Sequence, residues 1–402
     1  MNARTQRGAA LWKNHRRPAG LTLAVLLAVA ASPAQAGSRE QAKRLHDRLN
    51  GTPASATQLD SMQADIDGGN ALAAALKAID NPNGSFYTVF LKNFVTPWTN
   101  RDQTAYAPLN DYTATVIGMV RDDVPFNTVL SADVLYIGRS SLGLPAYSNS
   151  GNDHYAQMEA QGVNLRDGLV SAQQSAVTGL PAAATAGVLT SRAAARAFFV
   201  AGTNRAMFRF TMINHMCTDL PQVMDTTRPT DRIRQDVSRS PGGDSRVFLN
   251  NCVGCHSGMD PMAQAFAHYD YTFVTDETTG SLKYTPATVV DKYFHNNTTF
   301  APGFVTPDDR WENRWRAGPN ALMGWDPTLP GSGTGAKTLG AEFGASDQFA
   351  QCQVRKAFKA VCLRAPSDGA DRSQVATMVG HFKQGYSLKK VFAESAVYCM
   401  GD

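Results

Sequence analysis

The stretch Cys252–Tyr271 reads CVGCHSGMDPMAQAFAHYDY, and its first five residues form the most specific pattern in the chain. Two cysteines separated by two residues and followed at once by histidine are the attachment signature of a c-type haem. Thiols one helical turn apart can reach both vinyl groups of one porphyrin, and the adjacent His256 then becomes the proximal ligand of the iron. We therefore predict one haem c, covalently attached through Cys252 and Cys255, with His256 as metal ligand.

Two other uses of a C-x-x-C pattern fit the sequence less well. A zinc ribbon needs a second pair of ligands at suitable spacing, and no further C-x-x-C or H-x-x-x-H follows. A redox dithiol needs a thioredoxin-like strand–helix context, which the flanking Asn250, Asn251, Ser257 and Gly258 do not provide. Because the haem signature occurs once, we expect a single haem rather than a multihaem protein.

The N-terminus has the pattern of a secretory signal peptide, predicted to span residues 1–36. A basic start precedes the apolar run Leu21–Ala31, and Ala34-Gln35-Ala36 forms an A-x-A cleavage site. That run of 11 residues is shorter than the roughly 20 needed to cross a bilayer. We therefore expect a periplasmic or secreted protein with no membrane span after signal cleavage.

The signal peptide also accounts for the positive net charge. It contains no acidic residue and five basic residues: Arg4, Arg7, Lys13, Arg16 and Arg17. Removing these five charges from the formal net charge of +4 leaves the mature chain at −1. Global charge therefore gives no attraction to nucleic acid, and we expect no nucleic-acid partner.

The fold class is predicted to be mainly α, because helical periodicities outnumber convincing strand patterns. The expected N-terminal helices are Ser38–Asn50, Thr57–Ile79, Phe86–Phe94, Leu109–Arg121 and Asn127–Leu135. Tyr271–Val274 and Leu282–Tyr284 predict one hairpin. We divide the mature chain into a helical N-terminal region at 37–225, a cytochrome c-like haem-binding region at 226–330 and a C-terminal three-helix region at 331–402.

Two stretches rich in turn-forming residues are predicted to lack regular structure. The polar segment 226–246 is expected to be a linker or an exposed approach to the haem motif. The segment Asp326–Gly344 holds five glycines and two prolines, which predicts a non-helical connection before the C-terminal helices.

The remaining cysteines predict two disulfides, as an exported chain allows. A helix over Ser346–Val361 would place Cys352 and Cys362 about 15 Å apart along its axis, too far for a bond that needs Cα atoms within about 7 Å. Two more antiparallel helices follow, so Cys362 and Cys399 fall at helix ends that face the same way. We predict the pairs Cys362–Cys399 and Cys217–Cys352.

The haem segment also resembles that of a known family. The pattern C-x-x-C-H-x-x-x-D-P, followed by Phe266–Asp270, is similar to the haem segment of the planctomycete-type cytochrome c-like proteins. Gly187–Arg192 and Cys217–Pro221 look like the segments just upstream in that family, and Phe349–Cys399 looks like its C-terminal helical domain of unknown function. The resemblance covers about 185–402 well and 86–155 loosely. It implies an exported haem protein, but it implies no particular reaction.

The sixth ligand of the iron would decide the function, and three alternatives are open. Met323 lies in a loop far enough from the motif to pass around the porphyrin, His295 is the competing ligand, and the position could be open. On the proximal side, Asp260 is expected to cap a helix over Met262–His268, or Pro261 to offer its carbonyl oxygen to His256.

The function favoured by these patterns is an exported monohaem c-type cytochrome that transfers single electrons to a redox partner protein. A methionine ligand would suit a carrier because it raises the potential and closes the site. The alternatives are a haem peroxidase or oxygenase with an open distal site, and an envelope interaction or sensor protein that carries a haem. No catalytic residue is assigned, and an electron carrier is favoured over an enzyme.

Overall fold

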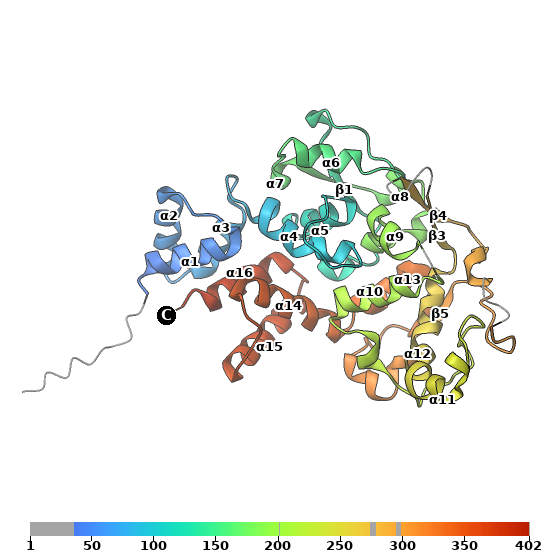
Figure 1. Cartoon of the computed structure of the whole chain (residues 1–402). Coiled ribbons are helices and arrows are strands. Elements are labelled where there is room, and N and C mark those ends of the chain that lie inside the picture. The colour runs from blue at the N-terminus through green and yellow to red at the C-terminus, as the bar shows by residue number, and fades with distance from the viewer. Residues whose placement is uncertain (1–35, 201, 274–278, 295–298, 402) are drawn as a thin grey trace, which may run out of the picture. The chain divides into compact units, whose positions relative to one another are not determined.

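The computed structural model describes residues 36–200, 202–273, 279–294 and 299–401 (Figure 1). The described residues are 57% helical and 7% strand, which confirms the mainly α class. Residues 36–402 form one compact unit. The predicted signal peptide, apart from Ala36, lies outside the described residues. No helix in the described ranges combines the length and apolar character needed to cross a membrane.

The first helices pack against the C-terminal end of the chain, so that blue and red segments lie side by side in Figure 1. Ser55 and Asn70 cap the second and third helices, which splits the predicted helix Thr57–Ile79 at Gly68. The elements are α1 (Ser38–Asn50), α2 (Ala56–Asp67), α3 (Ala71–Ile79), the π-helix η1 (Phe86–Leu91), α4 (Lys92–Val95), η2 (Thr96–Thr99) and α5 (Asp111–Arg121).

The predicted helix Asn127–Leu135 is wrong. A single 3-10 turn, η3 (Phe126–Thr128), is followed by strand β1 (Leu135–Gly138), which pairs antiparallel with β2 (Leu169–Ala172). The Asp133 carboxylate accepts hydrogen bonds from the backbone and hydroxyl of Ser175, and these long-range contacts replace the helix. The helices that follow are α6 (Asp153–Ala160), α7 (Leu165–Gly168), α8 (Gln174–Thr178), α9 (Arg192–Phe198) and α10 (Arg205–Met216).

The C-x-x-C-H motif lies on one continuous helix that is made of three segments. These are α11 (Ser245–Val247), the π-helix η9 (Phe248–Cys252) and α12 (Val253–Ala263). The hairpin predicted after the motif is confirmed as β3 (Tyr269–Phe273) and β4 (Gly280–Tyr284), with Tyr271 opposite Leu282. Its predicted residue Val274 lies outside the described residues.

The segment 226–246 is exposed at both ends, as predicted, but its middle is buried and is not a linker. Ile233 and Arg234 are almost fully buried, at 1% and 2% exposure. Ile233 and Val237 form a small apolar cluster with Phe248 and Val253, just beside the first motif cysteine. Composition misled the prediction here, because a polar segment can still be buried when its arginine finds charged partners.

The stretch Asp326–Gly344 is also more regular than predicted. After β6 (Ser332–Thr334), which pairs with β5 (Arg310–Glu312), residues Gly335–Gly344 form helix α13. A Cβ atom at Gly340 would overlap the carbonyl oxygen of Leu130, and one at Gly344 would overlap that of Asn127. These glycines therefore let the helix pack directly against backbone, and this packing outweighs their low helix propensity.

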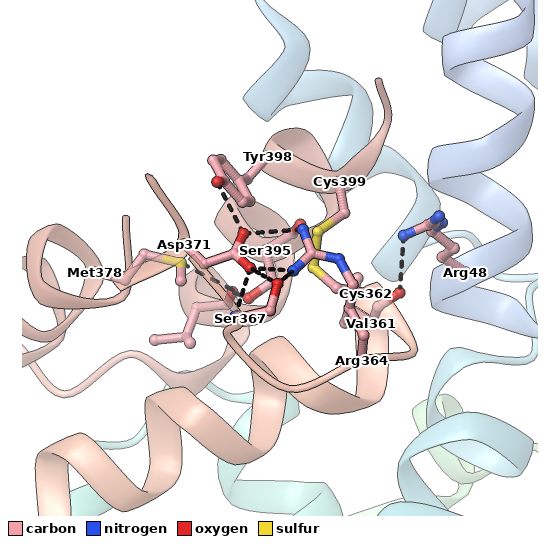
Figure 2. The surroundings of a disulfide bond; sticks show 11 residues. Arg48, Val361, Cys362, Arg364, Ser367, Asp371, Met378, Ser395, Tyr398 and Cys399 are labelled. Carbon is pink, nitrogen blue, oxygen red and sulfur yellow. Dashed lines mark hydrogen bonds and ion pairs between the residues drawn. A yellow bond between two sulfur atoms is a disulfide. The ribbon is translucent and has the colours of Figure 1, made fainter. Parts of the chain in front are cut away.

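The three predicted C-terminal helices are confirmed as α14 (Asp347–Cys362), α15 (Gly369–Lys383) and α16 (Leu388–Cys399). Both predicted disulfides are present, with Cα–Cα distances of 5.3 Å for Cys217–Cys352 and 5.5 Å for Cys362–Cys399. Figure 2 shows the second bond beside Asp371, whose carboxylate accepts hydrogen bonds from Arg364 and Tyr398.

Candidate functional site

The two motif cysteines are free thiols, while the four others are closed in disulfides. Cys252 ends the π-helix η9 and Cys255 lies in the first turn of α12, so both project from one continuous helix. Each side chain is half-buried. The Cys255 thiol contacts the carbonyl oxygen of Leu220 at 3.4 Å. The two sulfurs are therefore available from the same helix and are not bonded to each other.

The environment of Cys255 differs from that of a redox dithiol. Burial, with smaller contributions from Cys252 and Asp219, raises the pKa of the Cys255 thiol. A catalytic C-x-x-C motif instead lowers the thiol pKa at a helix N-terminus or beside a positive charge. Because the helix here begins before Cys252, neither sulfur lies at an N-terminus. This thiol is protonated at neutral pH, which disfavours the redox-dithiol alternative.

His256 is oriented by a carboxylate one turn further along the same helix. Its Nδ1 atom lies 3.2 Å from both carboxylate oxygens of Asp260. Residues four apart share one face of an α-helix, which explains the contact. An Nδ1–H that donates to Asp260 fixes the tautomer with the lone pair on Nε2. Nε2 has no hydrogen-bond partner among the described residues, so it is free to bind a metal.

Asp260 is itself buried, at 2% exposure, and is held by two arginines. Arg205 donates from Nε to Oδ1 at 2.8 Å and from Nη2 to Oδ2 at 3.0 Å. Arg234 Nη2 lies 3.7 Å from Oδ1. Burial alone would raise the pKa of Asp260, but Arg205, Arg234 and His256 outweigh it and hold that pKa well below its usual range. Asp260 is therefore an ionised acceptor for His256.

A second aspartate completes this buried ionic network. Arg205 Nη1 donates to Asp236 at 2.6 Å, so one guanidinium bridges the two carboxylates. Arg234 stacks over the Tyr293 ring at 4.8 Å, and its Nη2 donates to the hydroxyl of Thr203 at 2.7 Å. The network fixes Asp260, and through it His256, to α10 and to the segment after it.

Both roles predicted around Asp260 are wrong. Asp260 and Pro261 lie inside α12, and no helix starts at Met262, because α12 is followed by the short 3-10 turn η10 (Gln264–Phe266). Among the described residues, His256 Nδ1 contacts the Asp260 carboxylate and not the Pro261 carbonyl. The i, i+4 geometry brings the side chain closer than any backbone acceptor.

Sequence reasoning missed the partners of Asp260. Arg205 lies in the predicted helical N-terminal region 37–225, to which no site residue was assigned, and Arg234 and Asp236 lie in the segment 226–246. The sequence feature that could have pointed to them is Asp260 itself, an acidic residue within the apolar run from Met259 to Met262. A buried carboxylate needs a counter-charge, although the sequence does not show which arginine supplies it.

Three apolar side chains on or against the helix that carries the motif are exposed. Leu249 is 58% exposed and Met224 is 47% exposed. Met224 packs directly on Gly254, where a Cβ atom would overlap its side chain. Val247 is 37% exposed on the same helix. We call Met224, Val247 and Leu249 the apolar rim.

Met323, the favoured candidate for a sixth ligand, is not joined to His256 by any contact within the described residues. Met323 ends the 3-10 helix η13 (Pro319–Met323) and is buried in the main core. The nearby Trp325 donates to the carbonyl of Trp315 at 3.0 Å, and Trp315 packs on α12 at Gly258. Gly258 is about 200° around the helix from His256. His295 lies outside the described residues, and Met323 stays a prediction.

Comparison with known proteins gives no further assignment, because no family model, curated protein or solved structure matches the chain. The resemblance to the planctomycete-type cytochrome c-like family thus stays a prediction. Within the described ranges, no group of three or more His, Cys, Asp and Glu side chains could hold a metal ion. A c-type haem takes only one iron ligand, His256, from its motif.

Proposed function

We propose that this chain is an exported monohaem c-type cytochrome that passes single electrons to a redox partner protein. The observation that carries the attached haem is the arrangement on one helix of two free thiols and a histidine whose Nδ1 is bound by a buried carboxylate. The choice of an electron carrier rests on the predicted sixth ligand Met323. The region 226–330 would be the haem-binding part, between the helical region 37–225 and the three-helix region 331–402.

The residues present fit a covalently attached haem. Each thiol would add across one vinyl group, with the sulfur bonding to one carbon and the thiol hydrogen passing to the other, so no oxidant is consumed. Gly254, where Met224 packs, lies about 160° around the helix from His256, so this part of the apolar rim is on the opposite face of α12.

When bound, the haem would supply an iron that takes up and releases one electron. The protein's own contribution is to hold His256 in one orientation and in one tautomer. Asp260 keeps the Nδ1 proton on the far side of the ring, and Arg205 and Arg234 keep Asp260 ionised. Arg205 also joins Asp260 on α12 to Asp236. The orientation of the His256 ring therefore depends on this network and not on a mobile surface side chain.

The second candidate, a haem enzyme with an open distal site, has one observation in its favour. A carboxylate that accepts the Nδ1 proton makes imidazole a stronger electron donor. Stronger donation stabilises the oxidised iron, which suits oxidant chemistry better than a high-potential carrier does. Met323 as sixth ligand would favour the carrier, because it closes the site.

Absorption spectra of the exported protein, with and without carbon monoxide, separate the two candidates. The carrier predicts no carbon monoxide binding to the reduced protein and a methionine–iron band that Met323→Ala removes. Met378→Ala, which alters another buried methionine, is the control and should leave the band unchanged. Rapid carbon monoxide binding by the unaltered protein would refute the carrier and support the enzyme.

A further inference from the structure

A pocket of about 670 Å³ lies between η2, α10 and α14. Trp98 and Phe210 contribute aromatic walls, and Arg101, Arg209 and Lys356 contribute positive charge. Among the described residues, Asp219 is the one carboxylate that lines it. The lining therefore combines a few aromatic and apolar side chains with a larger number of polar and charged ones.

Lys356 is the unusual residue of this pocket. Its Nζ lies 3.1 Å from the centroid of the Trp98 ring and donates to the carbonyl oxygen of Asn214 at 2.7 Å. No carboxylate of the described residues lies within ion-pair distance of Nζ. Burial lowers the pKa of Lys356 well below its usual range, because no negative charge offsets the loss of water. An ammonium group has three N–H donors. One of them is used for the carbonyl oxygen of Asn214, and Nζ lies over the Trp98 ring.

The other cations of the pocket are not equally free. Arg209 is neutralised by Asp219 through two hydrogen bonds of 2.7 and 2.6 Å. Arg101 donates to the carbonyl oxygen of Ala197 at 2.6 Å, and the described part of the chain offers it no acidic partner. The pocket therefore holds two basic side chains without a carboxylate partner among the described residues, Arg101 and Lys356, beside aromatic walls.

We propose that this pocket binds a small organic anion, in which a carboxylate meets Lys356 and Arg101 while an aromatic or aliphatic body packs on Trp98 and Phe210. A carboxylate would supply the counter-charge that Lys356 otherwise lacks, through charge-assisted hydrogen bonds. The proposal does not depend on the haem, and it adds a ligand site to the proposed cytochrome function.

Calorimetric titration of the exported full-length protein with phenylacetate tests this proposal, with the uncharged 2-phenylethanol as the matched probe. We expect phenylacetate to bind with a Kd below about 1 mM and 2-phenylethanol to bind at least about tenfold more weakly. Lys356→Met should weaken phenylacetate binding at least about tenfold. Lys359→Met, at an exposed position of the same helix, should leave the affinity unchanged.

Arg101→Gln provides a second variant, because this exposed side chain can change without disturbing the core. It should weaken phenylacetate binding several-fold while circular dichroism stays the same. Absence of any binding at millimolar phenylacetate would overturn the proposal. Equal affinities of the unaltered protein and both pocket variants, or equal binding of the charged and uncharged probes, would also overturn it.

Discussion

Two regions of this chain combine a pair of cysteines with a buried aspartate bound by arginine, and they use the combination differently. In the C-terminal region, Cys362 and Cys399 are bonded to each other beside Asp371. On α12, Cys252 and Cys255 stay open beside Asp260. The same residue types therefore occur once as a closed structural unit and once as an open arrangement.

The two aspartates differ in the groups that they bind. Asp371 accepts hydrogen bonds from Arg364, Ser367 and Tyr398, and each of these ties a helix end or a loop in place. Asp260 accepts from His256, whose other ring nitrogen remains free. A carboxylate that ends a network stabilises the fold, whereas one that orients a free imidazole prepares it to bind a ligand.

The largest expected effect is the loss of covalent haem when the two motif cysteines are replaced by alanine. The disulfide pair Cys362 and Cys399 provides the control. Cys252→Ala with Cys255→Ala should abolish covalent haem completely, because no other thiol is free within the described structure. Cys362→Ala with Cys399→Ala should leave the haem attached. Haem staining of denatured, exported protein on a gel distinguishes these outcomes, and haem retained by the first variant would refute the attachment site.

The second prediction concerns the buried network. Arg205→Met leaves Asp260 and Asp236 without their shared cation, which should lower the free energy of unfolding by about 3–5 kcal/mol. Arg209→Met lies on the same helix but removes an exposed pair, so it should cost less than about 1 kcal/mol. Urea unfolding measures both, and equal losses would show that the network is not specially important.

The third prediction compares the two disulfides with each other. Replacing Cys362 and Cys399 by alanine should lower the free energy of unfolding by about 2–4 kcal/mol. Replacing Cys217 and Cys352 should cost about 1 kcal/mol more, because the bond closes 135 residues rather than 37. Denaturant unfolding of the two double variants checks the order, and a larger loss for the shorter loop would contradict this account.

The smallest effect is a change in acid stability. The hydrogen bonds from Arg364 and from the Ser367 backbone hold the pKa of Asp371 well below its usual range. The stabilisation from this carboxylate is therefore present above the unfolded pKa of about 3.9 and is lost as the pH falls through the folded value. Asp371→Asn should lower stability at neutral pH and flatten its decline below pH ~4.

Unfolding curves between neutral and acidic pH measure this change, and Asp102→Asn at an exposed position serves as the control. An unchanged acid profile in Asp371→Asn would show that the carboxylate gives no stability.

The sequence predicted local features well and long-range features poorly. Helical periodicity identified α14, α15 and α16, and helix length then excluded a Cys352–Cys362 bond. The partners of Asp260 could not be predicted, because Arg205 and Arg234 are 55 and 26 residues away from it. Helix α13 was missed for a similar reason, since its glycines are explained only by the backbone they pack against.

Within the candidate site, the motif predicted which residues to examine but not how they are held. Cys252, Cys255 and His256 follow from spacing alone. The orientation of His256 depends on Asp260, for which the sequence suggested a helix cap instead. A buried ionic network is assembled by tertiary structure, so its members carry no local signature.

Mass spectrometry of the peptide that contains Cys252 and Cys255 tests the central claim most directly. The protein should be expressed with its full N-terminus in a host that attaches haem c, then denatured and digested with trypsin. We predict that this peptide carries the mass of one haem, while the peptides of Cys217, Cys352, Cys362 and Cys399 are linked by disulfides. An unmodified peptide, or one with a Cys252–Cys255 disulfide, would contradict the proposed function.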